Sequence, residues 1–280
     1  MASIARTKVM VSGLPGKMAT AFARAAQKDE RVWLVNHAFT GEEVKDDYIE
    51  INGQRITLIR PSERDRGKYI FSMVPGYRET IIIDFTEPAS INGNVDFYVR
   101  NGLYFVAGTT GGDTEKMRKD IAESDISAVI APNMAIPIVA ITDAIEQMAE
   151  RFPGSCRGSK FIGTESHQWW KKDPSGTMKK LIQSFNKLGA EASLFDIRSI
   201  RNKEEQLSMG VPEEFLDAHA YHDYRLVFED AGVELRFGHD VNGREAYALG
   251  AIEAVVYLDR KRISGDVGKV YGMTDVIKNL

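Results

Sequence analysis

The chain has 280 residues, of which 43% are hydrophobic and 27% charged, a composition typical of a globular protein with a sizeable core. At about 150 residues per domain, this length predicts two domains. The 36 basic residues (Lys and Arg) and 40 acidic residues (Asp and Glu) give a net charge of −4. This balance argues against a nucleic-acid partner, because such proteins present clustered basic surface. The single cysteine, Cys156, excludes an internal disulfide and fits a reducing compartment.

The sequence shows no membrane-spanning or secretory pattern. Its longest apolar stretch, around residues 135–145, is interrupted by Pro137 and Asp143 and is far shorter than the roughly 20 residues that cross a bilayer. Residues 1–8, MASIARTK, lack the apolar region of a signal peptide. We therefore expect a cytoplasmic protein without a membrane partner.

Strands alternate with helices through the first half of the chain. An apolar strand at 9–12 leads through a glycine-rich turn into a helix whose apolar residues recur at helical spacing from Met18 to Ala26. Further strands are predicted at 32–35, 80–85, 103–107 and 128–131, a hairpin at Asn52-Gly53, and helices over 87–100 and after Asp113. This alternation predicts an α/β domain with a parallel sheet and right-handed crossovers, which we assign to residues 1–133.

The second half is richer in strands. After a helix over 138–151, strands are predicted at 161–164, 194–200, 221–228 and 233–238. A helix with one apolar face, from Met178 to Leu188, interrupts them. We expect an α+β domain with a mixed sheet over 134–247, and a C-terminal helix within 248–280 that packs back on the first domain.

Gly13, Gly16 and Ala19 form a G-x-x-G-x-x-A pattern between the first strand and the first helix. A pyrophosphate can approach the backbone amides at a helix N-terminus only where side chains are absent. The pattern therefore favours dinucleotide binding over a purely structural turn.

The acidic residue that binds a ribose 2′-hydroxyl in many such domains, about 20 residues later, is missing. The second strand ends in Asn36-His37-Ala38-Phe39, and Glu42 and Glu43 come late. Without a carboxylate to repel a 2′-phosphate, NADPH is permitted, and Lys17 is a candidate cation for that phosphate.

The segment 165–177 reads ESHQWWKKDPSGT. Asp173 followed by Pro174 has the form of an N-cap and a first helical position, so Ser175, Gly176 and Thr177 would lie in the first turn. Backbone amides and the macrodipole favour an anion there. Between residues 168 and 187, five lysines against one aspartate give a local charge of +4. The alternative is a solvated helix face without a ligand.

His167 precedes Lys171 by four residues and is the only nearby side chain able to donate a proton near neutral pH without special tuning. Its alternative role is structural. His219 and His222 form an H-x-x-H pair, but residues three apart on a strand face opposite sides, so we expect no metal site.

Together these motifs resemble the 4-hydroxy-tetrahydrodipicolinate (dihydrodipicolinate) reductase family of lysine and diaminopimelate biosynthesis. The resemblance covers nearly the whole chain and rests on VSGLPGKM at 11–18, DFTEPAS at 84–90, FVAGTTGGD at 105–113, APNM at 131–134, ESHQWWKKDPSGT at 165–177, GVPEEFLDAHAYH at 210–222 and GREAYALGAIEAV at 243–255. The H-x-x-x-K-x-D-x-S-G-T run is the most specific part. The E-S-H-Q and GVPEE segments look like the plant-type branch.

The resemblance implies an oxidoreductase with an N-terminal Rossmann-like domain and a C-terminal domain for substrate binding and homotetramer formation. The reaction would be hydride transfer from NADPH, or from NADH, to a small cyclic dicarboxylate. The implied cofactor contacts are Gly13, Leu14, Pro15, Gly16, Lys17, Met18, Phe85, Gly108, Thr109, Thr110, Ala131, Pro132, Asn133 and Met134. His167 would donate a proton, and Lys171 would bind substrate and assist. The other implied substrate contacts are Thr110, Gln168, Ser175, Gly176 and Thr177.

Three features depart from the common bacterial pattern of this family. Gln168 and Trp169 stand in place of a histidine and an arginine, Ala19 replaces the third fingerprint glycine, and Pro15 stiffens the phosphate loop. Two other functions stay open: reduction of a related cyclic imine in secondary metabolism, and a dinucleotide-binding regulator without turnover. The intact histidine and lysine of the motif argue against the regulator.

Overall fold

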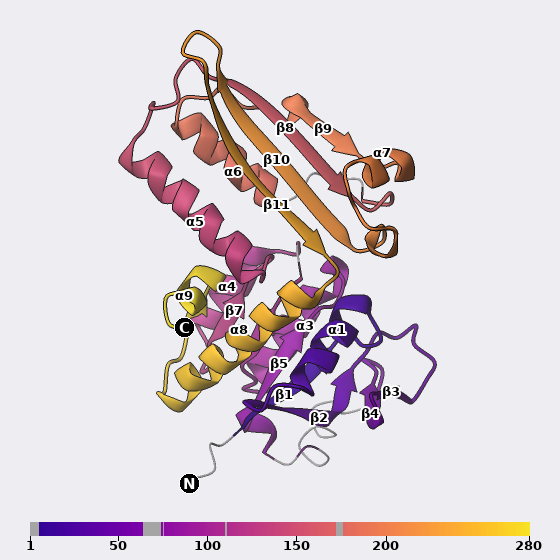
Figure 1. The fold of residues 1–280 in the computed structure, drawn as a ribbon. Helices are drawn as coiled ribbons and strands as arrows, with labels where there is room; N and C mark the ends of the chain where they lie inside the picture. Colours follow the sequence, from indigo (N-terminus) through magenta and orange to yellow (C-terminus); the bar gives the residue numbers. More distant parts are fainter. Residues whose placement is uncertain (1–5, 64–73, 75, 110, 172–175) are drawn as a thin grey trace. The chain divides into compact units, whose positions relative to one another are not determined.

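The computed structural model describes residues 6–63, 74, 76–109, 111–171 and 176–280. The chain divides into two compact units (Figure 1): the first joins Met1–Ile136 to Glu245–Leu280, and the second is Pro137–Arg244. Each unit has its own sheet, and each is described by itself. Among the described residues, none of the helices has the length and apolarity of a membrane span.

The sheet of the first unit is parallel apart from one edge strand. Its described strands lie in the order β12 (Val270–Tyr271), β7 (Ala128–Ile130), β6 (Phe105–Ala107), β5 (Thr80–Asp84), β1 (Thr7–Ser12), β2 (Val32–Phe39), β4 (Gln54–Ile59) and β3 (Tyr48–Ile51). The edge strand β3 runs antiparallel to β4 across a turn at Asn52 and Gly53, both with positive φ. Every residue of β5 is buried, as expected for a parallel strand covered on both faces.

The strand order decides which helices share a face. α1 (Lys17–Ala26) connects β1 to β2, and α3 (Pro88–Arg100) connects β5 to β6 in the opposite direction along the sheet. Right-handed crossovers in opposite directions place α1 and α3 on opposite faces. Accordingly, α8 (Glu245–Ile263) packs against α1, whereas α4 (Thr114–Ala122) packs against α3. The order therefore reverses between β1 and β5, the position at which sheets of this type bind ligands.

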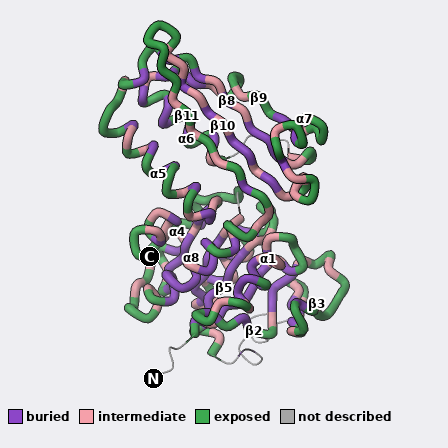
Figure 2. Tube along the Cα trace, viewed as in Figure 1, coloured by how far each residue is buried: buried purple, intermediate pink, exposed green. Residues whose placement is uncertain are grey.

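The helix α8 completes the first unit, although it comes from the far end of the sequence. It is buried over much of 248–259 (Figure 2). Asp259 accepts a buried hydrogen bond of 2.8 Å from the Thr7 hydroxyl at the start of β1. Gly250 lies so close to the loop after β7 that a Cβ on it would be 1.7 Å from the carbonyl oxygen of Met134.

The second unit is a mixed sheet with helices packed on one face. Its described strands lie in the order β11 (Val233–Asn242), β10 (His219–Phe228), β8 (Lys160–His167) and β9 (Ile197–Ile200). β8 and β9 are parallel, and the other pairs are antiparallel. The long helices α5 (Ile136–Arg151) and α6 (Gly176–Lys187) contribute to a core that contains Phe161, Phe185, Tyr224 and the free Cys156.

The remaining described elements are short. They are η1 (Tyr77–Glu79), η2 (Leu194–Asp196), α7 (Lys203–Ser208), η3 (Glu213–Phe215) and α9 (Met273–Ile277). The parallel Rossmann-like sheet followed by a mixed sheet confirms the predicted fold class.

Several predicted strands have the wrong bounds, among them the strand predicted at 233–238, which continues to Asn242. The strand predicted at 32–35 continues to Phe39, and the one predicted at 161–164 continues to His167. The region predicted as strand at 194–200 begins with the turn η2, so β9 starts at Ile197. Polar residues end the apolar runs at 32–35 and 161–164, but pairing with β1 and with β10 keeps the backbone extended. Cross-strand pairing thus overrides local pattern.

Candidate active site

The glycine loop after β1 leaves no room for a side chain at Gly13 or Gly16. Gly13 has a φ of +107°, and a Cβ on it would lie 3.0 Å from the carbonyl carbon and oxygen of Phe85, directly after β5. A Cβ on Gly16, the N-cap of α1, would lie 2.7 Å from the carbonyl oxygen of Gly13. The loop stands at the reversal of strand order, where α1 directs its first-turn amides. These residues fit the pyrophosphate of a dinucleotide.

Two further loops reach the same edge of the sheet. A Cβ on Gly108, after β6, would lie 2.5 Å from Cε1 of Phe85 and 3.3 Å from Cε of Met134. Thr109 donates a hydrogen bond of 2.8 Å to the carbonyl oxygen of Thr86. The structure therefore brings Phe85, Gly108 and Met134 together, three of the residues that the resemblance implies for the cofactor.

The remaining cofactor candidates lie in these loops with different exposure. Leu14 and Ala131 are buried, Met18 and Asn133 are partly buried, and Pro15, Lys17 and Pro132 are exposed. Thr110 lies outside the described residues.

The end of β2 lies beside the glycine loop. The carbonyl oxygen of Phe39, the last residue of β2, accepts a hydrogen bond of 2.9 Å from the amide of Gly13. The next residue, Thr40, donates from its hydroxyl to the carbonyl oxygen of Leu14 at 2.5 Å. The carboxylate of Glu42 binds the amide of Ser62 at 2.9 Å and also its hydroxyl. A neutral threonine therefore occupies the position after β2, the Glu42 carboxylate is engaged by Ser62, and the Glu43 carboxylate lies beside Gly41.

β8 ends at His167 in a cluster of polar side chains on the helix-covered face of the second sheet. Glu165 and His167 share this face because they are two residues apart on one strand, and His222 of β10 stands opposite Glu165. Nε2 of His167 lies 3.0 Å from Nε2 of His222 and 3.6 Å from Oε2 of Glu165. His239 of β11 stands opposite His222, and their rings stack with centroids 4.6 Å apart.

Glu165 is the buried negative charge of this cluster, with no exposed side-chain surface. Its Oε1 accepts a hydrogen bond from the Arg201 guanidinium and another, of 3.1 Å, from the Ser199 hydroxyl. Arg201 also donates through Nε to the carbonyl oxygen of Lys171 at 2.9 Å. The carboxylate is thus paired, as a buried charge requires, and connected to the segment that carries Lys171.

Burial, together with the positive charges of Lys171 and Arg201, lowers the pKa of His167 to about 3. Burial also holds the pKa of His222 well below its usual value. Both imidazoles are therefore neutral at pH 7 in this ligand-free state. The prediction that His167 can donate a proton near neutral pH without special tuning is wrong for this state, because desolvation disfavours the charged ring.

The ligand-type atoms of Glu165, His167 and His222 all lie within 4.8 Å of one another and are buried. Hydrogen bonds between these groups account for the cluster, and Arg201 on the same carboxylate opposes an added cation. The H-x-x-H pair is divided between the faces of β10, as predicted: His219 binds the Ser166 hydroxyl at 2.8 Å on the other face.

Lys171 lies in the turn after β8, where its amide donates to the carbonyl oxygen of Gln168 at 3.0 Å. The Gln168 side chain donates to a backbone carbonyl of β10 at 2.8 Å, so the turn is tied to the sheet. The described part of α6 begins at Gly176, where a Cβ would meet nothing within 4 Å. No described neighbour requires a glycine there, which fits a position that admits a ligand. Thr177 is partly exposed, and Asp173, Pro174 and Ser175 lie outside the described residues.

The sequence reasoning missed four members of the cluster, Glu165, Arg201, Tyr224 and His239, and weighed His222 only as a metal ligand. A usable signal exists in the alternation of Glu165 with His167 and of His222 with Tyr224 along their strands. The register that sets one strand against the other is not visible in the sequence. Only the structure shows that these pairs meet.

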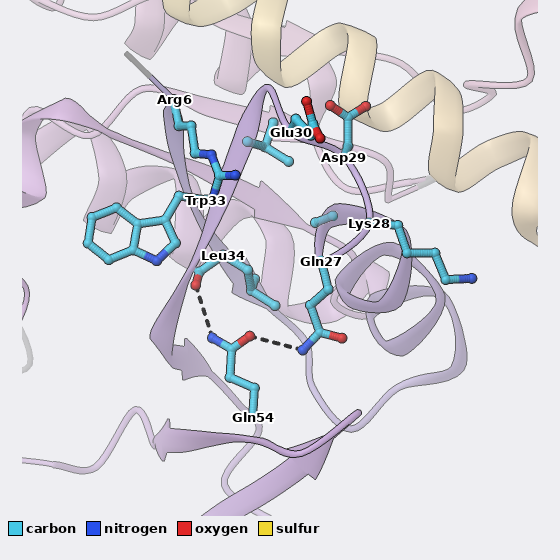
Figure 3. A pocket seen from close by; sticks show the side chains of 10 residues that line it. Arg6, Gln27, Lys28, Asp29, Glu30, Trp33, Leu34 and Gln54 are labelled. Carbon is cyan, nitrogen blue, oxygen red and sulfur yellow. Dashed lines mark hydrogen bonds between the residues drawn. The ribbon is translucent and has the colours of Figure 1, made fainter. Parts of the chain in front are cut away.

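A surface hollow of about 280 Å³ lies at the opposite edge of the first sheet, between the end of α1 and the start of β2 (Figure 3). Two of its polar side chains form hydrogen bonds within the hollow: Gln27 donates to Gln54 at 2.9 Å, and Gln54 donates to the carbonyl oxygen of Leu34 at 3.0 Å. Ligands of such sheets bind at the carboxyl ends of the strands, so we assign no site to this hollow.

Comparison with known proteins identifies both halves of the chain. The family model for the dihydrodipicolinate reductase N-terminus matches residues 7–134, and the model for the C-terminus matches residues 138–277.

Two plant proteins are similar along most of their length. A probable 4-hydroxy-tetrahydrodipicolinate reductase 1 of Oryza sativa subsp. japonica, named chloroplastic, is 40% identical over 96% of this chain and 78% of its own. The 4-hydroxy-tetrahydrodipicolinate reductase 2 of Arabidopsis thaliana, also named chloroplastic, is 39% identical over 96% of this chain and 77% of its own.

The fold has a counterpart among solved structures. A dipicolinate-bound dihydrodipicolinate reductase from Paenisporosarcina sp. TG-14 superposes with a TM-score of 0.67 at 18% identity, over 97% of this chain and 99% of the other. The two family-model matches and the plant relatives show that the chain belongs to the dihydrodipicolinate reductase family.

Proposed function

We propose that this protein reduces 4-hydroxy-tetrahydrodipicolinate or dihydrodipicolinate to tetrahydrodipicolinate in lysine and diaminopimelate biosynthesis, with NAD(P)H as reductant. The observation that carries the proposal is the combination of two sites in one chain. The first unit holds the glycine loop, which has no room for a side chain at Gly13 or Gly16 and is called the glycine cradle below. The second unit holds the buried His167, followed four residues later by Lys171. The names of relatives that cover 96% of the chain support the choice of substrate.

The residues divide the chemistry between binding and proton transfer. The reduced nicotinamide supplies the hydride when the cofactor is bound in the glycine cradle. Lys171 and the first-turn amides at Gly176 bind the substrate carboxylates by charge-assisted hydrogen bonds. His167 gives a proton to the substrate as negative charge develops on its conjugated nitrogen, which lowers the barrier.

Substrate binding has to charge His167 before it can donate. The pKa of about 3 leaves the ring neutral in the free protein, but two substrate carboxylates nearby favour the charged form and raise this pKa. Binding is therefore accompanied by proton uptake. Calorimetry of dipicolinate binding in buffers that differ in ionisation enthalpy measures this uptake, and a heat that is the same in every buffer contradicts it.

We propose NADPH as the preferred cofactor, with NADH as the alternative. The position after β2 is the neutral Thr40, the Glu42 carboxylate is held by Ser62, and the exposed Lys17 begins α1. A neutral residue after β2 and a cation at the start of α1 favour a 2′-phosphate over a 2′-hydroxyl held by a carboxylate. A higher kcat/KM with NADH than with NADPH would reject this preference.

The decisive experiment uses substrate made in situ by the aldolase that catalyses the preceding step of this pathway. It follows the loss of NADPH or NADH absorbance. Omitting the aldolase is the control. We expect turnover that depends on both the substrate and the cofactor. Absence of turnover with either cofactor rejects the proposal. Turnover with another cyclic imine would then identify a related reductase. Cofactor binding without any turnover would identify a regulator.

We also propose a homotetramer in a cytoplasmic compartment. The resemblance supports the tetramer, and light scattering of the purified protein tests it. The chloroplastic names of the plant relatives make the compartment a direct question for fluorescence microscopy of the tagged protein.

A further inference from the structure

Three side chains on the helix-covered face of the second sheet form a hydrogen-bonded chain that ends at the proposed proton donor. The Tyr224 hydroxyl binds Nδ1 of His222 at 2.5 Å, and Nε2 of His222 binds Nε2 of His167 at 3.0 Å. The two imidazole rings meet edge to face, with centroids 4.9 Å apart at 88°. When both rings are neutral, one of the two facing Nε2 atoms carries a hydrogen and the other accepts it.

The tyrosine decides the direction of this chain. Tyr224 is 1% exposed, and burial raises the pKa of its hydroxyl, so the hydroxyl keeps its hydrogen. Within the part of the chain that the structure describes, Nδ1 of His222 is the hydrogen-bond partner found for this hydroxyl. If the tyrosine only accepted, its own O–H would be a buried donor without an acceptor, which is costly. The hydroxyl therefore donates to Nδ1.

The remaining hydrogens follow from that assignment. Because Nδ1 of His222 accepts, its single hydrogen is on Nε2, which donates to Nε2 of His167. The hydrogen of His167 must then be on Nδ1. We propose that His222, oriented by Tyr224, is a positioning residue that fixes His167 as the Nδ1–H tautomer, so that the proton passes to the substrate from Nδ1. The proton transfer from Nδ1 rests on the proposed function. The assignment of the tautomer does not.

The proton balance of the step involves both rings. One proton enters the pair from solvent when the dianionic substrate binds, so the two rings together carry three hydrogens and share one positive charge. Nδ1 of His222 then donates to the Tyr224 oxygen, and the tyrosine hydrogen loses its acceptor, a cost that favours the neutral pair until substrate is bound. As the Nδ1 proton of His167 moves to the substrate, the hydrogen between the two Nε2 atoms moves from His222 to His167. Both rings end neutral, and the substrate gains one proton.

The surroundings explain why the pair is neutral until substrate arrives. Oε2 of Glu165, 3.6 Å from Nε2 of His167, favours the charged pair, while Arg201 on the same carboxylate opposes it. The Lys171 ammonium and the stacked ring of His239 also oppose it. His219 faces the other side of β10 and also opposes charge on His167.

Nitrogen NMR of histidine-labelled protein at pH 7.5, without substrate, tests the tautomer directly. The five histidines give few signals, and the spectrum of His167→Asn assigns the one of interest. We expect a protonated Nδ1 and an unprotonated Nε2 on His167. A protonated Nε2 on His167 overturns the proposal. This measurement needs no turnover, so it decides the tautomer even if the proposed reaction is rejected.

Tyr224→Phe tests the role of the hydroxyl with a minimal change. We expect a mixture of tautomers on His167 and a kcat lowered roughly threefold to tenfold, the loss expected for one neutral hydrogen bond, with KM within about twofold. The matched control is Tyr221→Phe, on the other face of the same strand, where the hydroxyl binds Asn242 at 3.2 Å. An unchanged tautomer in Tyr224→Phe, or an unchanged kcat with an altered tautomer, overturns the proposal.

Two substitutions of His222 separate positioning from packing. His222→Gln keeps an amide N–H that can donate to Nε2 of His167, whereas His222→Leu keeps only volume. We expect kcat to be higher in the glutamine variant than in the leucine variant. Equal kcat values in two folded variants argue for a packing role and overturn the proposal.

Discussion

The glycine loop of the first unit and the histidine cluster of the second are built on opposite principles. The loop requires the absence of side chains at two positions, because a Cβ on Gly13 or on Gly16 would lie 3.0 or 2.7 Å from backbone atoms. The cluster depends on atoms that are present, in hydrogen bonds that connect side chains of several strands. Added volume should therefore damage the first site, and altered hydrogen bonding the second. The following predictions test this contrast.

The largest effect is expected from removing the proposed proton donor. His167→Asn should lower kcat about 100-fold or more, because positioned general acids contribute about 10²–10⁴-fold. The cofactor dissociation constant should stay within about twofold, since the glycine loop belongs to the other unit. Steady-state kinetics and fluorescence titration with NADPH measure the two quantities. Equal losses in kcat and in cofactor affinity would contradict the separation of the two sites.

Added volume in the loop should have the converse effect. Gly13→Ala places a methyl group against the Phe85 carbonyl at a φ of +107°, so we expect cofactor affinity to fall at least roughly tenfold, with a stability loss of about 1–3 kcal/mol. Gly53→Ala is the control, because Gly53 also has positive φ, of 79°, but a Cβ there meets nothing within 4 Å. It should lose stability alone. Comparable losses of cofactor affinity in both variants would contradict the assignment of the cofactor to the glycine loop.

Lys171→Ala removes one cation from the second site. We expect the catalytic rate to fall at least tenfold, a barrier increase of about 1.4 kcal/mol, while NADPH binding is retained. The exposed Lys179 of α6 offers the control variant Lys179→Ala, which should behave like the parent protein. A matching loss of cofactor affinity would place Lys171 in the wrong site.

The smallest effect concerns stability in mild acid. The pKa values of His167, His219, His222 and His239 are lowered by burial, so the unfolded second unit binds more protons than the folded one below about pH 6.5. Stability should be fully present above that pH and fall as the pH drops toward 3. Urea unfolding of Trp33→Phe at pH 7.5 and 5.5 follows Trp169 and Trp170 of this unit alone. An equal or higher midpoint at pH 5.5 would contradict the burial of neutral imidazoles.

The contrast also explains what the sequence could reveal. Gly13, Gly16 and the strand before them are local features, so their spacing predicted both the turn and its ligand class. His167 and Lys171 were noticed for the same reason. Glu165 and His222 are 57 residues apart in sequence and meet only through the register of β8 and β10. The low pKa of His167 was equally inaccessible, because it depends on burial and on Arg201, which arrives from another segment.

The hydrogen bond between Thr7 and Asp259 joins the two ends of the chain, which affects how the protein folds during synthesis on the ribosome. The first unit consists of two pieces, and the second unit is inserted between them, so β1 emerges long before the helix that covers it. Because α8 also presses Gly250 against the Met134 carbonyl, the nucleotide loops stay incomplete until that helix has been translated. We therefore expect the inserted unit to fold first in the nascent chain, although its sequence begins later, and the N-terminal strands to need protection until translation is nearly finished.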